Sequence, residues 1–356
     1  MKKNKLSFLA LAATAFFFSC TKDHSGPPQA PPKVTTGLYV LNQGVYGANN
    51  TTLTYYDFGT GAATTDYFKK INGFGLGDTG SDFIIYGGKM YIVMNVSGYV
   101  AVANSVTAKF MDTIDFKNAG VNRGPENVVA SGNKVFVSST DGTVAVIDTS
   151  TLAIQKFITV GSNPAQMAVS GNNLYVSNTG GFSAHFDSTV SVIDLNSLSE
   201  TGKITVGTNP GSIATDDAGN MYVVCTGDYN AIAPSLVKVS LSTNTVTKTV
   251  DSAVGTIRYY NNTLITTGGY LGAANTGILN TADLGAVRPS FVVDGTPIVN
   301  PYGLDIDPAT GDVYVGDAKD YTSSGEVFSF DKTGKKKFSF SVTPGISPIR
   351  TQLIQQ

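Results

Sequence analysis

The sequence of 356 residues has no tryptophan, two cysteines and two histidines, and only 14 % of its residues are charged. Two cysteines, Cys20 and Cys225, cannot build a framework of several disulfides. Beyond residue 24, His185 is the one histidine, and the glutamates are Glu126, Glu200 and Glu326. Acid–base catalysis depends on histidines or tuned carboxylates. The composition therefore argues against an enzyme, and we predict no catalytic residues.

A helical hydrophobic period is also missing, since no 12-residue window repeats its apolar positions every 3.6 residues. Glycine is abundant, at 39 residues, and threonine, serine, valine and asparagine are frequent. β-Branched residues suit the half-buried surface of a sheet, and glycine and asparagine suit turns. The composition predicts an all-β protein with many turns.

The first 19 residues read as an export signal rather than as part of the fold. A basic head, MKKNK, precedes the apolar run 6–19, which is too short to span a bilayer. Phe17-Phe18-Ser19-Cys20 resembles a bacterial lipobox, which implies that Cys20 becomes the lipid-bearing first residue of the mature chain. The alternative is an ordinary signal with an incidental cysteine.

Residues 20–35 are rich in proline and polar residues, and this composition predicts a flexible tether. With a lipid on Cys20, the tether would hold residues 36–356 at a membrane surface by the lipid alone, and we expect an exported protein at the outer membrane, on the cell surface. Removal of residues 1–19 takes away three lysines and no acid, so the mature chain is more acidic than the full chain at −2. This charge argues against nucleic-acid binding.

A strand motif recurs at intervals of 39 to 52 residues along the chain. It has an aromatic or aliphatic residue followed by small and β-branched ones, as in 174-LYVSN-178. Its marker residues are Tyr39, Tyr91, Phe136, Tyr175, Tyr222, Leu264 and Tyr314. A second strand follows each marker strand, and most units then have a further strand. A short apolar run, read as another strand, opens the next unit. Four-stranded units of this length predict the blades of a seven-bladed β-propeller. Two packed sandwiches are the structural alternative.

The two ends of the chain predict how the ring closes. The first unit begins at its second strand, 38-LYVLN-42, and the chain ends with an unused inner-strand pattern at 344–354. The N- and C-terminal segments should therefore pair within one blade, so that 36–356 forms one domain.

Strand direction alternates within a blade, so the two kinds of connection lie on opposite faces. Tight turns such as 170-SGNN-173 join the first strand to the second and the third to the fourth; we call their side the hairpin face. The longer connections define the loop-rich face, where function is expected to concentrate. Its candidate ligand-binding residues are Tyr46, Phe74, Tyr99, Phe182, His185, Tyr229, Tyr270, Tyr302 and Tyr321. Aromatic rings and hydroxyls among amides suit a large, mostly neutral ligand, although many of these residues could simply pack their own loops.

Other polar residues favour structural roles. Asp305, Asp307 and Asp312 lack the spacing of a helix–loop–helix calcium site, so we interpret 305–312 as a turn. Asp148 and Asp194 end third strands and should cap turns. Cys225 is expected to be buried and inert. We expect no metal and no cofactor.

Two resemblances narrow the interpretation. The units 143–181 and 189–215, with Tyr-Val-Ser-Asn and Val-x-Val-Ile-Asp elements, resemble the YVTN-type repeat propellers. The segments 37–57, 73–78 and 302–335 look like the BtuG-type surface lipoproteins. That likeness implies a seven-bladed propeller that captures cobalamin outside the outer membrane and caps a TonB-dependent transporter. The loop 178–188 carries no motif that matches cobalamin binding.

The leading hypothesis is therefore a non-enzymatic surface lipoprotein. Its loop-rich face would bind a large solute such as cobalamin or another corrinoid and pass it to a TonB-dependent transporter. One alternative is an adhesion propeller that binds a protein or glycan with the same face. Another is a lactonase-like propeller enzyme.

Overall fold

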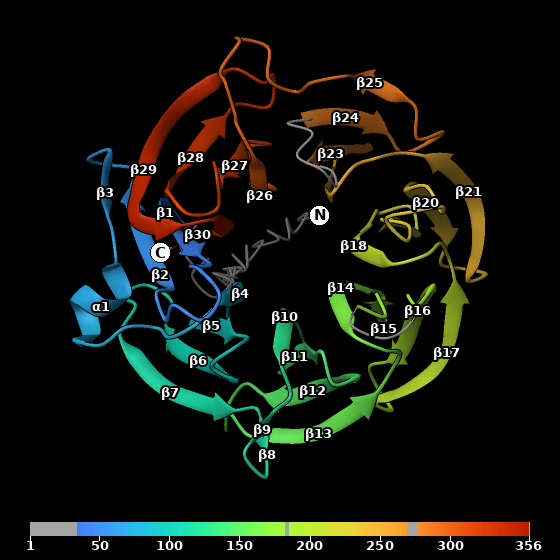
Figure 1. Cartoon of the computed structure of the whole chain (residues 1–356), viewed down its shortest axis with the longest axis horizontal. Helices are drawn as coiled ribbons and strands as arrows, with labels where there is room; N and C mark the ends of the chain where they lie inside the picture. Colours follow the sequence, from blue (N-terminus) through green and yellow to red (C-terminus); the bar gives the residue numbers. More distant parts are fainter. Residues whose placement is uncertain (1–33, 182–184, 269–275, 356) are drawn as a thin grey trace, which may run out of the picture. The chain divides into compact units, whose positions relative to one another are not determined.

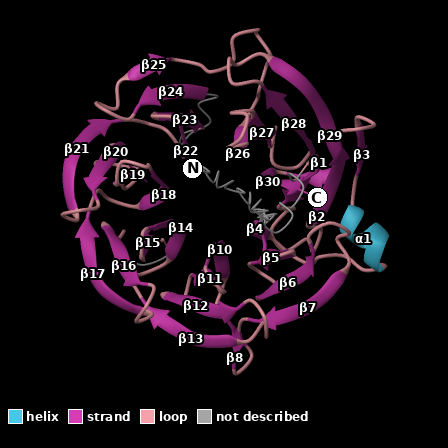
Figure 2. Ribbon diagram, turned by 180° about the vertical axis from the view of Figure 1, so that it is seen from behind, coloured by secondary structure: helices cyan, strands magenta, loops and turns pink. Residues whose placement is uncertain are grey.

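A computed structural model describes residues 34–181, 185–268 and 276–355. Seven antiparallel sheets of four strands each surround a central axis (Figure 1). The expected seven-bladed all-β propeller is thereby confirmed. In each sheet an inner strand lines the axis and the fourth strand forms the outer wall, as the view from behind also shows (Figure 2).

The strands are given from the inside of each blade outward. Blade 1 comprises β30 (Pro348–Gln355), β1 (Thr35–Asn42), β2 (Thr52–Asp57) and β3 (Ala62–Thr64), and blade 2 comprises β4 (Gly80–Tyr86), β5 (Lys89–Met94), β6 (Tyr99–Asn104) and β7 (Phe110–Asp115). Blade 3 comprises β10 (Pro125–Ser131), β11 (Lys134–Ser139), β12 (Thr143–Asp148) and β13 (Ile154–Thr159), and blade 4 comprises β14 (Pro164–Ser170), β15 (Asn173–Asn178), β16 (Thr189–Asp194) and β17 (Ser199–Thr205). Blade 5 comprises β18 (Pro210–Thr215), β19 (Asn220–Cys225), β20 (Ser235–Ser240) and β21 (Thr245–Asp251), and blade 6 comprises β22 (Thr256–Tyr260), β23 (Thr263–Thr267), β24 (Thr276–Asn280) and β25 (Ala286–Arg288). Blade 7 comprises β26 (Pro301–Ile306), β27 (Val313–Asp317), β28 (Ser324–Phe330) and β29 (Lys336–Ile346).

The marker residues of the repeat form the hydrophobic cores. All seven are at most 4 % exposed. The buried apolar side chains fall into seven clusters, each between the facing sheets of two neighbouring blades. Tyr39, for example, packs with Phe83 and Met90 of the next blade. Since one twisted sheet cannot cover its own two faces, radial stacking buries the apolar residues of every blade.

The ring closes through its two terminal strands, as predicted. Strand β1 pairs antiparallel with β30, with Leu38 opposite Leu353 and Val40 opposite Thr351. The boundary of the inner strand differs from the expectation, because residues 344–346 continue the outer strand β29 and β30 begins at Pro348. This pairing supplies blade 1 with its innermost strand.

Two small elements were not anticipated. Helix α1 (Tyr67–Asn72) follows the three-residue strand β3, and a hairpin of β8 (Lys117–Asn118) and β9 (Val121–Asn122) lies between blades 2 and 3. The α1 segment lies at the outer edge, where Asn72 accepts a hydrogen bond from the backbone N–H of Phe110, at 2.8 Å. Phe68 is buried and anchors this helix. No described helix has the length and apolar character needed to cross a bilayer.

Candidate functional site

The loop-rich face displays apolar side chains on short, hydrogen-bonded loops. The loop after each second strand bonds to the loop that leads into the inner strand of the same blade, as from the N–H of Thr179 to the carbonyl of Asn163. The exposed large apolar residues of these loops include Tyr46, Tyr229, Ile232, Val299 and Tyr321, which are 47 % to 80 % exposed. In the described turns of the hairpin face, Val106 is the one comparable residue, at 39 %.

Two of the predicted tyrosines lie together at blade 7. The rings of Tyr302 and Tyr321 meet edge to face, with centroids 5.5 Å apart. The Tyr302 hydroxyl donates to Oε1 of Gln43 in the first loop of blade 1, at 3.0 Å, and the Tyr321 hydroxyl donates to Oδ1 of Asn300, at 3.3 Å. Burial, followed by the nearby Tyr321, raises the pKa of Tyr302 to about 12, so its hydroxyl stays protonated at neutral pH. We call these four residues the Tyr302 cluster.

The Tyr302 cluster is held in place by a buried carboxylate. Asp317, at the end of β27, accepts hydrogen bonds from the backbone N–H groups of Val299, Asn300 and Lys319 at 2.8 to 2.9 Å. Asp317 is only 2 % exposed. Because one side chain ties the loop that leads into β26 to the loop that follows β27, the aromatic rings of the cluster are positioned before any ligand binds.

Tyr229 forms a second aromatic contact, between blades 4 and 5. Its ring meets Phe186 edge to face with centroids 5.5 Å apart. Asp228 fixes the loop by accepting bonds from the backbone N–H groups of Asn230 and Ile232. His185, another predicted site residue, is exposed beside Phe186. Phe186 was not among the predicted residues, although it lies in the same aromatic loop segment.

The remaining predicted residues are placed separately. Tyr46 is 80 % exposed in the turn after β1. The partly buried Tyr99, the first residue of β6, donates its hydroxyl to the carbonyl of Leu76 and thereby fastens the loop between α1 and β4. Phe74 packs edge to face against Phe68 and Phe110 on the outer wall, away from the Tyr302 cluster, because α1 draws this segment outward.

Three predicted positions, Phe182, Tyr270 and the lipidation residue Cys20, lie outside the described residues.

Sequence reasoning missed a set of polar residues on the inner strands. Their side chains join neighbouring blades around the central channel. Asp82 accepts the N–H of Val128, Asn127 accepts the N–H of Met167, Ser212 donates to Gln166 and accepts the N–H of Ile257, and Asp305 accepts the N–H of Thr351. A recurring signal was present in the sequence, because a polar residue stands two places after a proline or glycine in 80-GSD-82, 125-PEN-127, 164-PAQ-166 and 210-PGS-212.

An ion-pair network occupies the same channel. Arg350 of β30 lies 2.8 Å from Asp305 Oδ1 through Nη1 and 3.1 Å from Asp82 Oδ1 through Nε. Nε of Arg258 lies farther from Asp305 Oδ1, at 3.7 Å. Burial raises the pKa of Asp82, and Arg350 opposes that rise by stabilising the carboxylate. Burial, with repulsion from Arg350, lowers the pKa of Arg258 to about 10.

Glu126 lies at the loop-rich end of the channel, on β10. It borders a cavity of about 210 Å³ together with Gln166, Ser212 and Ile349. Its Oε2 accepts a hydrogen bond from Nδ2 of Asn95 at 2.7 Å. Burial, and then repulsion from Asp82, raise the pKa of Glu126 to about 7. The carboxyl group therefore titrates near neutral pH, so its charge changes as the pH passes through this range.

Among the three aspartates of 305–312, Asp307 forms the turn that the sequence predicted. Asp307 accepts the N–H of Ala309 at 2.9 Å and the hydroxyl of Thr310 at 2.8 Å, which caps the turn. Asp312 pairs with Lys337 at 2.5 Å, whereas Asp305 faces the channel. No group of three or more His, Cys, Asp or Glu side chains within the described ranges could hold a metal ion. Asp148 and Asp194 also cap their turns, and Cys225 is buried at 1 % exposure.

Comparison with solved structures supports the fold. The chain is similar to hydrazine synthase of Kuenenia stuttgartiensis, with 19 % identity and a TM-score of 0.58 over 71 % of this chain and 76 % of that one. A quinoprotein alcohol dehydrogenase-like protein of Bacteroides thetaiotaomicron shares 14 % identity, with a TM-score of 0.64 over 90 % of this chain and 79 % of that one. The computationally designed Ika8 protein shares 13 % identity, with a TM-score of 0.56 over 86 % of this chain and 88 % of that one. At these identities the likeness concerns the fold alone.

No curated protein matches the chain. The family described as "Domain of unknown function (DUF5074)" matches residues 36–345, which is nearly all of the propeller. The chain therefore belongs to the DUF5074 family.

Proposed function

We propose that this propeller is a non-enzymatic binding protein that captures a large, mostly neutral solute on its loop-rich face. The observation that carries the proposal is the asymmetry of exposed aromatic and apolar side chains, which gather in the described loops of that face and are nearly missing from the turns of the opposite one. Exposed apolar groups concentrated on one face of a soluble domain are typical of a binding surface.

The chemistry of the face suits a ligand with both flat apolar and amide-bearing parts. Tyr46 and Tyr321 offer rings for stacking, while Gln43 and Asn300 supply amides beside the ring of Tyr302. The hydrogen bonds to Asp317 lower the ordering cost of binding, because the loops are already fixed. The resemblance of segments 37–57 and 302–335 to the BtuG-type lipoproteins supports a corrinoid such as cobalamin as this ligand.

The same resemblance supports a location and a partner. We propose that Cys20 carries a lipid, that the tether 20–35 holds the propeller at the outer membrane, and that the ligand passes to a TonB-dependent transporter. Incorporation of labelled fatty acid tests the anchor: the wild-type chain should be labelled and Cys20→Ser should not. Equal labelling of both chains would contradict lipidation at Cys20.

Titration of the purified propeller with cyanocobalamin by calorimetry tests the ligand. We expect micromolar or tighter binding, weakened roughly 3- to 10-fold by Tyr46→Ala or Tyr321→Asn, since a stacked aromatic contributes about 0.5–1.5 kcal/mol. Asparagine suits position 321 because φ is +63° there. Met111→Ala removes an exposed apolar side chain from the outer strand β7 and is the matched control.

Each outcome of this titration decides a part of the proposal. Absence of heat at micromolar concentrations would remove cobalamin as the ligand. Binding that is weakened equally by Met111→Ala and Tyr321→Asn would move the site away from the loop-rich face.

A second candidate function is adhesion to a protein through the same face. The exposed Ile232 and Val299 favour it, because aliphatic side chains at loop tips are common in protein interfaces. Pull-down from whole envelopes separates the two: recovery of a transporter supports solute delivery, whereas recovery of an unrelated surface protein supports adhesion.

A further inference from the structure

A second cavity lies at the other end of the central channel. It measures about 260 Å³ and is bordered by residues of five inner strands, among them Asn127, Gln166, Thr215, Arg258 and Arg350. Val129 and Tyr259, which also border it, stand near the hairpin-face ends of β10 and β22. The cavity is therefore separate from the loop-rich face, and the inference drawn from it does not depend on the proposed function.

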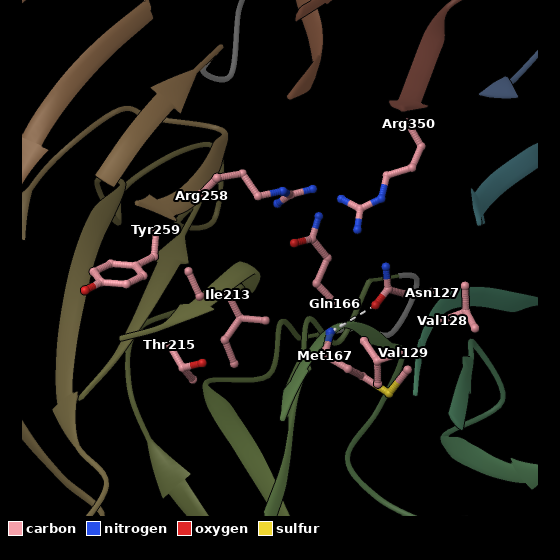
Figure 3. A pocket seen from close by; sticks show the side chains of 11 residues that line it. Asn127, Val128, Val129, Gln166, Met167, Ile213, Thr215, Arg258, Tyr259 and Arg350 are labelled. Atoms are coloured by element: carbon pink, nitrogen blue, oxygen red, sulfur yellow. Dashed lines mark hydrogen bonds between the residues drawn. The ribbon is translucent and has the colours of Figure 1, made fainter. Parts of the chain in front are cut away.

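Three groups of hydrogen-bond donors converge in this cavity. The guanidinium groups of Arg258 and Arg350 point toward each other from β22 and β30, and the amide of Gln166 reaches between them (Figure 3). Oε1 of Gln166 accepts a hydrogen bond from the Ser212 hydroxyl at 3.2 Å, which orients the amide so that its NH₂ group is turned to the guanidinium groups. None of the described residues that border the cavity is acidic.

The two arginines are unequally neutralised. Arg350 has two carboxylates within 3.1 Å, from Asp82 and Asp305. Arg258 has one, at 3.7 Å, and that carboxylate is the Asp305 already engaged by Arg350. Nη1 of Arg258 donates to the neighbouring carbonyl of Ile257 at 3.0 Å, which adds no negative charge. A buried guanidinium that shares its one counter-ion with a second guanidinium is incompletely neutralised, so Arg258 favours an added anion.

We propose that this cavity binds a small oxyanion, a carboxylate or a phosphate group, between Arg258 and Arg350. Guanidinium groups hold both kinds of oxyanion through paired N–H donors, and the Gln166 amide supplies a neutral donor to the same ligand. The cavity is smaller than most sites for drug-sized ligands, which restricts the occupant to a small anion. The low pKa of Arg258 agrees with the site, since an anion would relieve the repulsion between the two guanidinium groups.

Calorimetry of the purified propeller in chloride-free buffer, with inorganic phosphate in one arm and succinate in the other, tests the site. We expect saturable binding below about 10 mM in at least one arm, and the tighter arm identifies the preferred oxyanion. Arg258→Gln should weaken that binding roughly 10- to 100-fold, because one charge-assisted contact is lost. Arg288→Gln is the matched control, because Arg288 lies on the outer strand β25, where Nη1 donates to the exposed carbonyl of Thr333.

Gln166→Glu keeps the test decisive even where Arg258→Gln disturbs folding. This variant places a carboxylate between the two guanidinium groups, so it should raise the Tm and abolish binding of the added oxyanion. No saturable binding in either arm, wild-type affinity in Arg258→Gln, or a Gln166→Glu variant that melts earlier and still binds the oxyanion would each overturn the proposal.

Discussion

Replacement of Glu126 by glutamine should stabilise the propeller at alkaline pH and leave it nearly unchanged at acidic pH. Glu126 has a folded-state pKa of about 7, raised first by burial and then by Asp82, against an ordinary value of 4.5. A raised carboxyl pKa means that folding favours the protonated form. Its contribution to stability is therefore complete below pH 4.5 and is lost as the pH rises through 7.

The magnitude follows from the two pKa values. Their difference means that the free energy of unfolding is about 3 kcal/mol smaller under alkaline than under acidic conditions. Glutamine carries no ionisable group, so it does not incur this loss. Its Oε1 can still accept the hydrogen bond that Nδ2 of Asn95 gives to Glu126 at 2.7 Å, so the Asn95 amide keeps its acceptor.

Calorimetric melting at pH 5 and pH 8 measures the effect. Glu126→Gln should exceed the wild-type Tm by about 6 °C at pH 8 and by much less at pH 5, at about 2 °C per kcal/mol for a domain of this size. Glu326→Gln is the control for loss of a glutamate charge, since Glu326 lies 3.9 Å from Lys319 with its side chain 31 % exposed. Equal Tm differences at both pH values would refute the burial argument.

Three further outcomes follow from the structure. Arg350→Ala should lower the free energy of unfolding, measured in urea, by about 3–5 kcal/mol, because it leaves the carboxylates of Asp82 and Asp305 without their nearest cation. Adding Asp82→Asn to this variant should recover part of the lost stability. Cys225, whose pKa burial raises to about 11, should resist iodoacetamide until urea unfolds the chain, so rapid labelling of the native protein would contradict its burial. Asp148→Ala should lower the Tm at pH 7 and lose its effect near pH 2. The hydroxyl and N–H donors of the turn lower the pKa of Asp148 to about 2, and the cap weakens as that carboxylate is protonated; an undiminished effect at pH 2 would exclude the cap as its cause.

The framework of the propeller was readable from the sequence because it is local and repeated. Each marker residue after the first follows a tight turn and lies near the start of a strand of small and β-branched residues, and stacking between two neighbouring blades buries both faces of that strand. The same argument predicted the ring closure, since an inner strand was missing at one end and in excess at the other. Helix α1 escaped prediction because its six residues are too few for a helical period, and it displaced Phe74 from the loop-rich face.

The candidate site was predicted only in part. The sequence indicated which loops would be long and aromatic, and it named Tyr302 and Tyr321, which do lie together. It could not indicate that Gln43 would reach Tyr302, because the two positions meet only where the last blade adjoins the first. The polar residues of the channel had a recurring sequence signal, which Arg350 shares in 348-PIR-350, but Arg258 stands outside it.

The sequence by itself determined the number of blades, the position of the turns, the identity of the core residues and the face that carries the long loops. These features depend on periodicity and turn chemistry, which act between residues close in the chain. The tertiary structure alone decided that Asp82, Arg258, Asp305 and Arg350 share one channel. Each comes from a different blade, and only closure of the ring brings those four inner strands to a common axis, where burial makes charge pairing obligatory.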